Sequence, residues 1–255
     1  MGLSLQFPHL SYSHIQDTAV NKKDFAPHNH TWFEILYVFR GTGTFLIENK
    51  KYNFSDHALF LVPPNKYHVL QTPPAAEYER SVISFSEEIL PPALPRNAAC
   101  FLQVDENIVS LIGKFEGYAA RFKGDYLRLL FSNFLTELII LVTEDSQNGG
   151  DYDEVPEPVR QALDYIRDHV YEPLSAKEIA EHVYLSESYL SHAFSRAMHT
   201  SMMTYARRKK MFEAYSLLLK GMPPTRISQM LGYENYSTFL RCYKKEFGKL
   251  PSSLT

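Results

Sequence analysis

The chain has 255 residues and a net charge of −3, and 45% of its residues are hydrophobic. This length is enough for two domains with a core each, and the hydrophobic content excludes a wholly disordered protein. No unbroken apolar run exceeds five residues and the first ten residues carry no secretory pattern, so we expect a cytoplasmic protein that does not span a membrane. The two isolated cysteines, Cys100 and Cys242, are expected to be ordinary thiols.

Residues 25–85 carry the pattern of an antiparallel β domain. Short runs rich in β-branched and aromatic residues alternate with turn sequences, as is typical of a barrel or a sandwich. We expect strands at 32–39, 43–48, 58–62 and 80–85, with turns at 40–43, 48–51 and 63–65. The run from Phe33 to Phe39 is apolar on both faces except at Glu34, so this strand is predicted to be covered on both sides.

A helical pattern follows the proline-rich stretch at 90–95. Apolar residues at helical spacing predict helices near 108–115 and 125–143. The second helix is apolar over more than half of its circumference, so it must pack on two sides. We expect it to contact the barrel and a second copy of the chain, with the dimer contacts centred on Phe131, Phe134, Leu138 and Val142.

The last hundred residues contain the same helical unit twice, about 48 residues apart. Each unit begins with a short helix that meets a tight turn (within 179–186 and 227–234), and a second amphipathic helix follows, with Leu190 and Phe194 or Phe239 and Tyr243 facing inward. This pattern is typical of the helix-turn-helix, whose second helix can lie in a DNA major groove. A connecting helix near 202–220 would be roughly 27–30 Å long, close to the ~34 Å between successive major-groove segments.

The charge is distributed unevenly between the two halves. Residues 1–155 hold 12 Lys and Arg against 19 Asp and Glu, whereas residues 188–255 hold 11 against 3. A basic segment joined to an acidic one indicates that one domain binds nucleic acid. The alternative is a helical protein-interaction module with basic solvated faces, which would not account for the two repeated turns.

These residues resemble the AraC/XylS family of transcription regulators. The resemblance is carried by the sequences 174–180, 188–194, 227–239 and 243–251 in the C-terminal part, and the front part resembles the cupin-type sensor domain of the family. Leu240 and Lys210 depart from the family's pattern, in the second recognition helix and in the connecting helix. The chain is therefore expected to regulate transcription and not to be an enzyme.

The resemblance implies an α+β protein of two domains. We expect a cupin-like ligand-sensing barrel over 1–100, a helical dimerisation segment over 101–145, a linker over 146–156 and an all-α double helix-turn-helix over 157–255. The implied partners are double-stranded DNA, a small-molecule effector (a sugar is one candidate), a second copy of the chain in a homodimer, and RNA polymerase.

The outward faces of the two recognition helices are the predicted DNA interface. The candidate DNA-binding residues are Ser188, Ser191, His192 and Arg196 in the first unit, and Asn235, Tyr236, Ser237, Arg241, Lys244 and Lys245 in the second. We expect Arg241 to contact guanine in a bidentate manner, whereas Arg196, Lys244 and Lys245 are expected to contact phosphates.

His28, His30, Glu34 and His68 resemble the paired cupin motifs, in which three histidines and one glutamate can bind a divalent metal such as Fe, Mn, Zn or Ni. Residues 28–34 are predicted to place His28, His30, Trp32 and Glu34 on one strand face, and the turn at 63–65 returns His68 beside them. His57 and Asn65 replace glycines of the second motif.

Three interpretations of this cluster stay open. The expected one is a polar effector pocket without a cofactor, formed by His28, His30, Trp32, Glu34 and His68, in which Trp32 offers a stacking surface. The second is a metal site made by the three histidines and Glu34, and the third is a purely structural cluster around a buried carboxylate. The alternative function that the second interpretation favours is a metal-dependent cupin enzyme fused to a nucleic-acid-binding domain.

Overall fold

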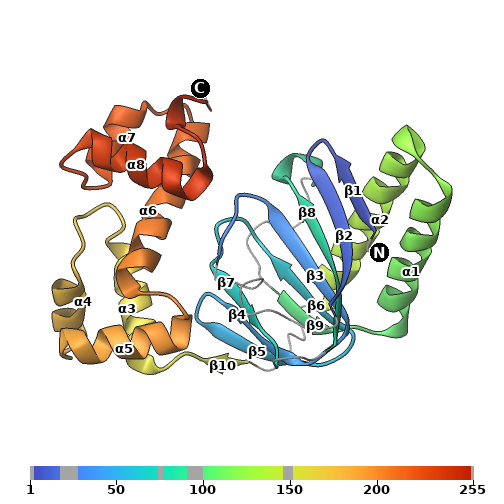
Figure 1. Cartoon of the computed structure of the whole chain (residues 1–255), viewed down its shortest axis with the longest axis horizontal. Helices are drawn as coiled ribbons and strands as arrows, with labels where there is room; N and C mark the ends of the chain where they lie inside the picture. Colours follow the sequence, from blue (N-terminus) through green and yellow to red (C-terminus); the bar gives the residue numbers. More distant parts are fainter. Residues whose placement is uncertain (1–2, 18–27, 74–76, 91–99, 146–151, 254–255) are drawn as a thin grey trace. The chain divides into compact units, whose positions relative to one another are not determined.

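The computed structural model describes residues 3–17, 28–73, 77–90, 100–145 and 152–253. The chain divides into two units, Met1–Asp153 and Glu154–Thr255 (Figure 1). Residues 146–151 of the expected linker lie outside the described residues. A two-residue strand, β10 (Asp153–Glu154), stands at the division between the units.

Antiparallel strands in two sheets form the N-terminal unit. They are β1 (Ser4–Phe7), β2 (Leu10–Asp17), β3 (Phe33–Arg40), β4 (Gly43–Ile47), β5 (Lys50–Phe54), β6 (Ala58–Val62), β7 (His68–Gln71), β8 (Tyr78–Phe85) and β9 (Cys100–Gln103). The larger sheet has the order β1-β2-β8-β3-β6-β9, and the smaller one contains β5, β4 and β7 as neighbours. The expected barrel-type architecture is thus confirmed, with β1 and β2 in addition to the strands that the sequence predicted.

Two details of the strands differ from the expectation. The predicted turn over 48–51 is shorter, because Glu48 adopts a left-handed conformation (φ 53°) and Lys50 and Lys51 already pair in β5. Strand β9 pairs with β6, so the barrel sheet continues to Gln103, beyond the expected boundary at residue 100. Strand β9 leads directly to Asp105, which caps the next helix by accepting from the backbone N–H groups of Asn107 and Ile108.

Strand β3 is covered on both faces, as predicted. Ile35 and Tyr37 belong to the core that the larger sheet shares with the helices of this unit, whereas Leu36 and Val38 belong to the core inside the barrel. Because side chains alternate along a strand, Glu34 shares the face of Leu36 and Val38 and points into the barrel. An apolar strand with a single inward carboxylate positions the candidate site.

Helices α1 (Glu106–Arg121) and α2 (Gly124–Asp145) pack together on the outer face of the larger sheet (Figure 1). The expectation that Phe131, Phe134, Leu138 and Val142 mediate dimerisation is wrong, because all four are buried in the core between helices and sheet. The most exposed apolar side chains in the described part of α2 are Tyr126, Leu129 and Ile140, with exposed fractions of 76%, 63% and 45%. The stretch Gly124–Thr143 is long and apolar enough to cross a membrane by length and composition alone, yet its buried face belongs to this core.

The C-terminal unit is helical and contains both predicted helix-turn-helix pairs. Its helices are α3 (Glu157–Asp168), α4 (Ala176–His182), α5 (Glu187–Met198), α6 (Met202–Leu219), α7 (Pro224–Met230) and α8 (Tyr236–Phe247). Polar caps start several of them: Ser175 forms a capping box with Glu178, and Ser186 and Asn235 cap the two recognition helices, α5 and α8. Helix α6 connects the pairs and has 18 residues, which corresponds to roughly 27 Å.

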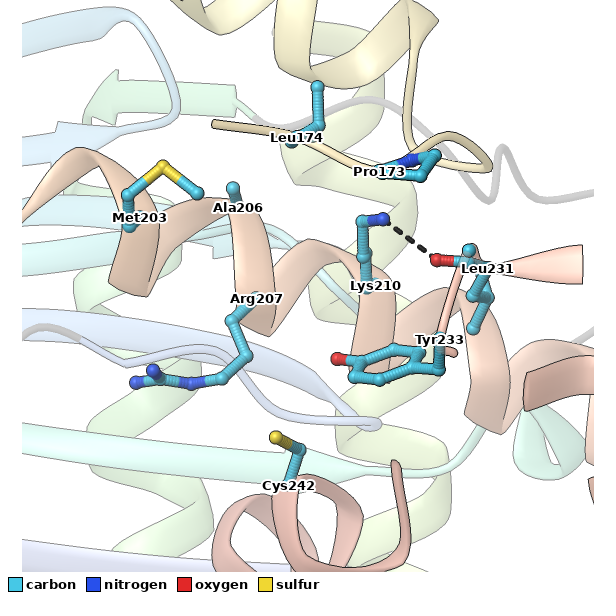
Figure 2. A pocket seen from close by; sticks show the side chains of 10 residues that line it. Pro173, Leu174, Met203, Ala206, Arg207, Lys210, Leu231, Tyr233 and Cys242 are labelled. Carbon is cyan, nitrogen blue, oxygen red and sulfur yellow. Dashed lines mark hydrogen bonds between the residues drawn. The ribbon is translucent and has the colours of Figure 1, made fainter. Parts of the chain in front are cut away.

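A buried lysine and a glycine fasten the two helix-turn-helix pairs to each other. Lys210 of α6 donates from Nζ to the carbonyl oxygens of Glu172, before α4, and of Leu231, at the end of α7. Gly232 has a φ of 72°, and a Cβ atom there would lie 2.8 Å from the backbone nitrogen of Pro173. Figure 2 shows Lys210, Leu231 and Pro173 at a pocket of about 330 Å³. Lys210 therefore serves as a structural crosslink inside the DNA-binding unit.

Candidate functional site

The two sheets of the N-terminal unit bring His28, His30, Glu34 and His68 together. Glu34 lies on β3 of the larger sheet, and His68 starts β7 of the smaller one. His28 and His68 form an isolated antiparallel bridge, in which each backbone N–H donates to the carbonyl oxygen of the other residue at 3.1 and 2.9 Å. This backbone pairing of His28 with His68 thus brings side chains from both sheets together.

The predicted arrangement of residues 28–34 on one continuous strand is wrong. Strand β3 begins at Phe33, and a bend at Thr31 and Trp32 precedes it. The bend folds His30 back toward Glu34, so the histidine reaches the carboxylate without the strand periodicity. Trp32 is partly buried, and the contact with the cluster that the described residues show is made by its backbone carbonyl and not by its ring.

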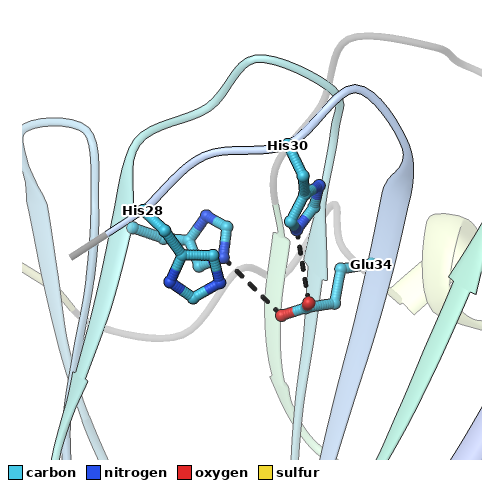
Figure 3. Close-up of side chains that lie close together, drawn as sticks. His28, His30 and Glu34 are labelled. Carbon is cyan, nitrogen blue, oxygen red and sulfur yellow. Dashed lines mark ion pairs between the residues drawn. The ribbon is translucent and has the colours of Figure 1, made fainter. Parts of the chain in front are cut away.

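The Glu34 carboxylate faces two imidazole nitrogens (Figure 3). His30 Nε2 lies 3.2 Å from Glu34 Oε2, and His68 Nε2 lies 3.7 Å from Glu34 Oε1. The ring of His28 is 4.3 Å from that of His68, centroid to centroid. The side chain of His68 is 1% exposed and that of Glu34 13%, whereas His28 is open to solvent. The site is therefore closed toward the barrel core and open at the side of His28.

Backbone carbonyl groups fix the orientation of two of the rings. His30 Nδ1 lies 2.7 Å from the carbonyl oxygen of Trp32, and His68 Nδ1 lies 2.9 Å from that of Lys66. Since a carbonyl only accepts, both Nδ1 atoms carry the proton and donate it. The Nε2 atoms of both rings are thereby turned toward the Glu34 carboxylate, with which His30 pairs.

Burial and charge shift the pKa values in the cluster in opposite directions. Burial alone would raise the pKa of Glu34, but the contact with His30 and the charges of the three histidines outweigh it and lower this pKa to about 2. Burial lowers the pKa of His68 to about 4, although Glu34 opposes the shift. Burial likewise opposes protonation of His30, but Glu34 prevails and raises its pKa. At neutral pH Glu34 is an anion and His68 a neutral imidazole.

The two residues that replace motif glycines keep the backbone conformation of glycine. His57 has a φ of 62° and Asn65 a φ of 65°. Asparagine tolerates this left-handed conformation well, while the His57 ring is held by a 2.8 Å hydrogen bond between Nδ1 and the hydroxyl of Tyr37. The turns that return His68 to the site are therefore preserved without glycine.

A second polar cluster, which the sequence did not indicate, joins the barrel to α1. His14 of β2 lies with Nδ1 2.6 Å from Glu116 Oε1 of α1 and with Nε2 3.0 Å from Glu79 Oε1 of β8. The hydroxyl of Tyr12 donates to the same Glu116 oxygen, and the His14 ring stacks on Phe39 at 4.5 Å. The alternation of Tyr12 and His14 along β2 was the available signal, but their partner Glu116 comes from a distant helix.

The recognition helices present the predicted DNA-binding residues to solvent. Leu190, Phe194, Phe239 and Tyr243 are completely buried, in agreement with the inward positions that the sequence predicted. Nine of the ten candidates (Ser188, His192, Arg196, Asn235, Tyr236, Ser237, Arg241, Lys244 and Lys245) are exposed, and Ser191 is partly exposed. These helices thus offer one polar outer face each, and that of α8 is basic through Arg241, Lys244 and Lys245.

Two features of this surface differ from the sequence prediction. The side-chain oxygen of Asn235 accepts from the backbone N–H of Ser237 at 2.8 Å, so this residue caps α8. Tyr184 and Tyr189 stand out in the first unit, with exposed fractions of 94% and 59%, although they were not among the candidates. Tyr184 occupies the turn between α4 and α5 with a φ of 58°.

Comparisons with known proteins match both units. Residues 16–112 match the model of the AraC-like ligand binding domain, and residues 179–255 match that of a helix-turn-helix domain. The arabinose operon regulatory protein of Escherichia coli is 26% identical over 226 residues, which are 84% of this chain and 76% of that protein. An HTH-type transcriptional regulator of Bacillus subtilis is 23% identical, with 88% of this chain and 86% of that protein covered.

The crystal structure of ToxT from Vibrio cholerae covers 97% of both chains at 12% sequence identity, with a TM-score of 0.40. The two domain matches together include well over half of this chain, and one lies in each unit. The two relatives that match over most of this chain are transcription regulators. The chain belongs to the AraC family of transcriptional regulators, with an N-terminal ligand-binding domain and a C-terminal helix-turn-helix domain that binds DNA.

Proposed function

We propose that a small-molecule effector binds in the barrel at His28, His30, Glu34 and His68, with Trp32 beside them, and thereby controls binding of the chain to its promoter. The observation that carries this proposal is a buried carboxylate surrounded by imidazoles and open to solvent at His28. Ligand pockets combine a few convergent polar groups with an apolar lining, and the barrel core supplies that lining here. A hydroxyl-rich molecule such as a sugar would satisfy these groups.

The DNA interface of the proposal consists of the exposed residues of α5 and α8. Ser188, Ser191, His192 and Tyr236 would lie toward base edges with Arg241 as the bidentate guanine contact, while Arg196, Lys244 and Lys245 would contact phosphates. Asn235 and Ser237 would contribute mainly at the start of α8, where Asn235 forms the cap. Both helices belong to one chain, so one chain would occupy two successive groove segments.

The remaining partners follow from the regulatory role. We propose a homodimer formed through the exposed apolar residues of α2, Tyr126, Leu129 and Ile140, and a contact with RNA polymerase at the promoter. We further propose that the chain acts in the cytoplasm and catalyses no reaction of its own. The polar link from His14 to Glu116 would carry a change in the barrel to α1.

The test is selection of bound sequences from random double-stranded DNA with the full-length protein. The proposal expects enrichment of a site with two segments about one helical turn apart per chain, and a change of affinity with one compound from a panel of sugars and hydroxy acids. Binding without any sequence preference would contradict the DNA interface. An effector response that persists after substitution of Glu34 by Gln and of His68 by Gln would contradict the barrel site.

A further inference from the structure

We propose that the pocket between the two helix-turn-helix pairs binds a small organic anion, a monocarboxylate with an apolar body, which holds the two pairs in one arrangement. The pocket has a volume of about 330 Å³ (Figure 2). Its walls come from the segment before α4, from α6, from the turn after α7 and from α8, so every wall belongs to the C-terminal unit. The site is separate from the barrel and independent of the effector site proposed there.

Both helix-turn-helix pairs contribute to the lining of this pocket. Pro173 and Leu174 lead into the first pair, whereas Gly232 and Tyr233 belong to the turn of the second. The recognition helix α8 contributes Cys242. A ligand in the pocket would therefore contact segments that orient both recognition helices, and its binding energy would stabilise their present arrangement.

The charged side chains in the lining are both cations. They are Arg207 and Lys210, and none of the ten lining residues is an Asp or a Glu. The two are three positions apart on α6, where side chains are neighbours with Cβ atoms about 5–6 Å apart. One carboxylate can therefore reach both cations and relieve the repulsion between them.

Neither cation forms an ion pair within the part of the chain that the structure describes. Lys210 Nζ donates to the carbonyl oxygens of Glu172 and Leu231, and an ammonium group has a third N–H. The guanidinium of Arg207 has five N–H donors, and its hydrogen bond to Thr204 Oγ1 is long, at 3.5 Å. Lys210 is only 7% exposed, and a buried charge is stable only when it is paired, so an anion in the pocket would complete its environment.

The rest of the lining favours an organic anion over an inorganic one. Most of the other side chains are apolar: Pro173, Leu174, Met203, Ala206 and Leu231. The ring of Tyr233 adds a flat surface, and Lys210 Nζ lies 5.9 Å from the centre of this ring. Burial and the neighbouring Cys242 raise the pKa of Tyr233, so its hydroxyl stays neutral and does not repel an anion. An apolar body can thus lie on the ring while its carboxylate meets the cations.

The volume of the pocket limits the size of the ligand. A water molecule takes up about 30 Å³ in the liquid, so 330 Å³ has room for a molecule of roughly ten non-hydrogen atoms. Benzoate has this size and a flat apolar ring, and its carboxylate matches the two-pronged donor geometry of the Arg207 guanidinium. It is therefore a suitable probe for the site.

The experiment measures the binding of benzoate to the full-length protein by calorimetry, with benzamide as the uncharged analogue. We expect saturable binding of benzoate with a dissociation constant of about 1 mM or lower, and a thermal midpoint that rises with its concentration. Benzamide should bind at least about tenfold more weakly, because it lacks the charge. Arg207→Met keeps the length of the side chain without the charge and should weaken benzoate binding at least about tenfold. Arg208→Met is the matched control on the same helix, since Arg208 pairs with Glu246 outside the pocket, and it should leave the affinity unchanged.

NMR of isotope-labelled methionine methyl groups locates the ligand in the wild-type protein, even where Arg207→Met fails to fold. The benzoate ring should shift the methyl resonance of Met203, which lines the pocket, and leave that of Met198, buried in α5 outside the lining, in place. Glu34→Gln should bind benzoate as the wild type does. Absence of saturable binding up to about 10 mM, equal affinities for benzoate and benzamide, or an unshifted Met203 resonance overturns the proposal. Loss of benzoate binding in Glu34→Gln would place the anion in the barrel and overturn it as well, whereas failure of the proposed barrel effector leaves this pocket unaffected.

Discussion

The Nζ atom of Lys210, in the middle of α6, lies 2.7 Å from the carbonyl oxygen of Leu231, the C-cap residue of α7. The same ammonium group also reaches the carbonyl of Glu172, and burial lowers its pKa. A helix end that is buried must have its carbonyl groups satisfied, and here a side chain from another helix does this. Lys210, which departs from the family's pattern, therefore makes a structural contact in this protein.

Substitution of Lys210 by Met should destabilise the DNA-binding unit. The apolar side chain keeps most of the volume but leaves two buried carbonyl oxygens without a donor, at a cost of about 1–3 kcal/mol. Chemical denaturation, followed by circular dichroism, measures this free energy of unfolding. Lys220→Met, at an exposed position at the end of α6, is the control and should change it by less than about 0.5 kcal/mol. Equal stability of the two variants would refute the crosslink.

Arg241 and Lys245 should differ in what they contribute to DNA binding. Arg241→Ala is expected to cost about 1–3 kcal/mol on the specific site and to relax the preference at one base pair. Lys245→Ala should weaken binding to all sequences about equally and reduce the slope of log K against log salt by about one. Fluorescence anisotropy with specific and scrambled DNA over a series of salt concentrations separates the two. A uniform loss for Arg241→Ala would mean that it contacts phosphate only.

The exposed and buried faces of α2 should respond differently to substitution. Leu129→Glu places a charge in the proposed dimer contact and should raise the dimer dissociation constant at least tenfold, or about 1.4 kcal/mol, with folding intact. Arg128→Glu, at the adjacent exposed position, controls for the added charge. Sedimentation velocity measures both. Phe131→Ala instead opens a cavity in the core and should cost about 3–5 kcal/mol of folding stability.

Glu34→Gln should abolish the effector response while leaving the fold intact. The substitution keeps the shape of the side chain but removes a charge, and hydrogen bonds to charged groups contribute about 1.5–3 kcal/mol each. Reporter activity with and without effector, together with the thermal midpoint of the purified variant, gives the answer. A folded Glu34→Gln protein that responds normally would move the sensing site elsewhere in the barrel.

The link between His14 and Glu116 should be visible as an energetic coupling. Each single substitution, His14→Ala or Glu116→Ala, removes one partner of a shared, partly buried network, so their effects on stability should not add. Contacting residues in such networks show interaction energies of about 0.5–3 kcal/mol in a double-mutant cycle. A double-mutant cycle between His14 and Lys114, an exposed residue of the helix that carries Glu116, should give an interaction energy of about zero. Additivity of the His14 and Glu116 changes would show that the two residues are not energetically coupled.

The sequence predicted best what depends on local periodicity. The positions of Leu190, Phe194, Phe239 and Tyr243 follow from helical spacing within one unit, and all four are buried as expected. The burial of β3 on both faces was likewise predicted from its apolar run. These patterns depend on residues that are close in the sequence, so their prediction does not require the tertiary contacts to be known.

What the sequence could not predict depends on partners far along the chain. The apolar surplus of α2 was correctly seen, but whether Phe131 faces a sheet or another chain depends on how α1 and the larger sheet enclose it. The gathering of the four cluster residues was expected from their motif, yet the bend at Thr31 and Trp32 that achieves it carries no glycine or proline. From the sequence, Asn235 could either contact a DNA base or cap α8, and only the position at which the helix starts decides between the two.

The close approach of Gly232 to Pro173 has a consequence for promoter architecture. With no room for a Cβ atom between them and with Lys210 bonded to both segments, we expect the two helix-turn-helix pairs to keep one relative orientation. Insertion of about five base pairs between the two segments that one chain contacts would turn them to opposite sides of the duplex, half a turn of about 10.5 base pairs apart. One chain should therefore reject such an operator outright. Any variation in the spacing of natural sites would then have to lie between the two copies of the proposed dimer.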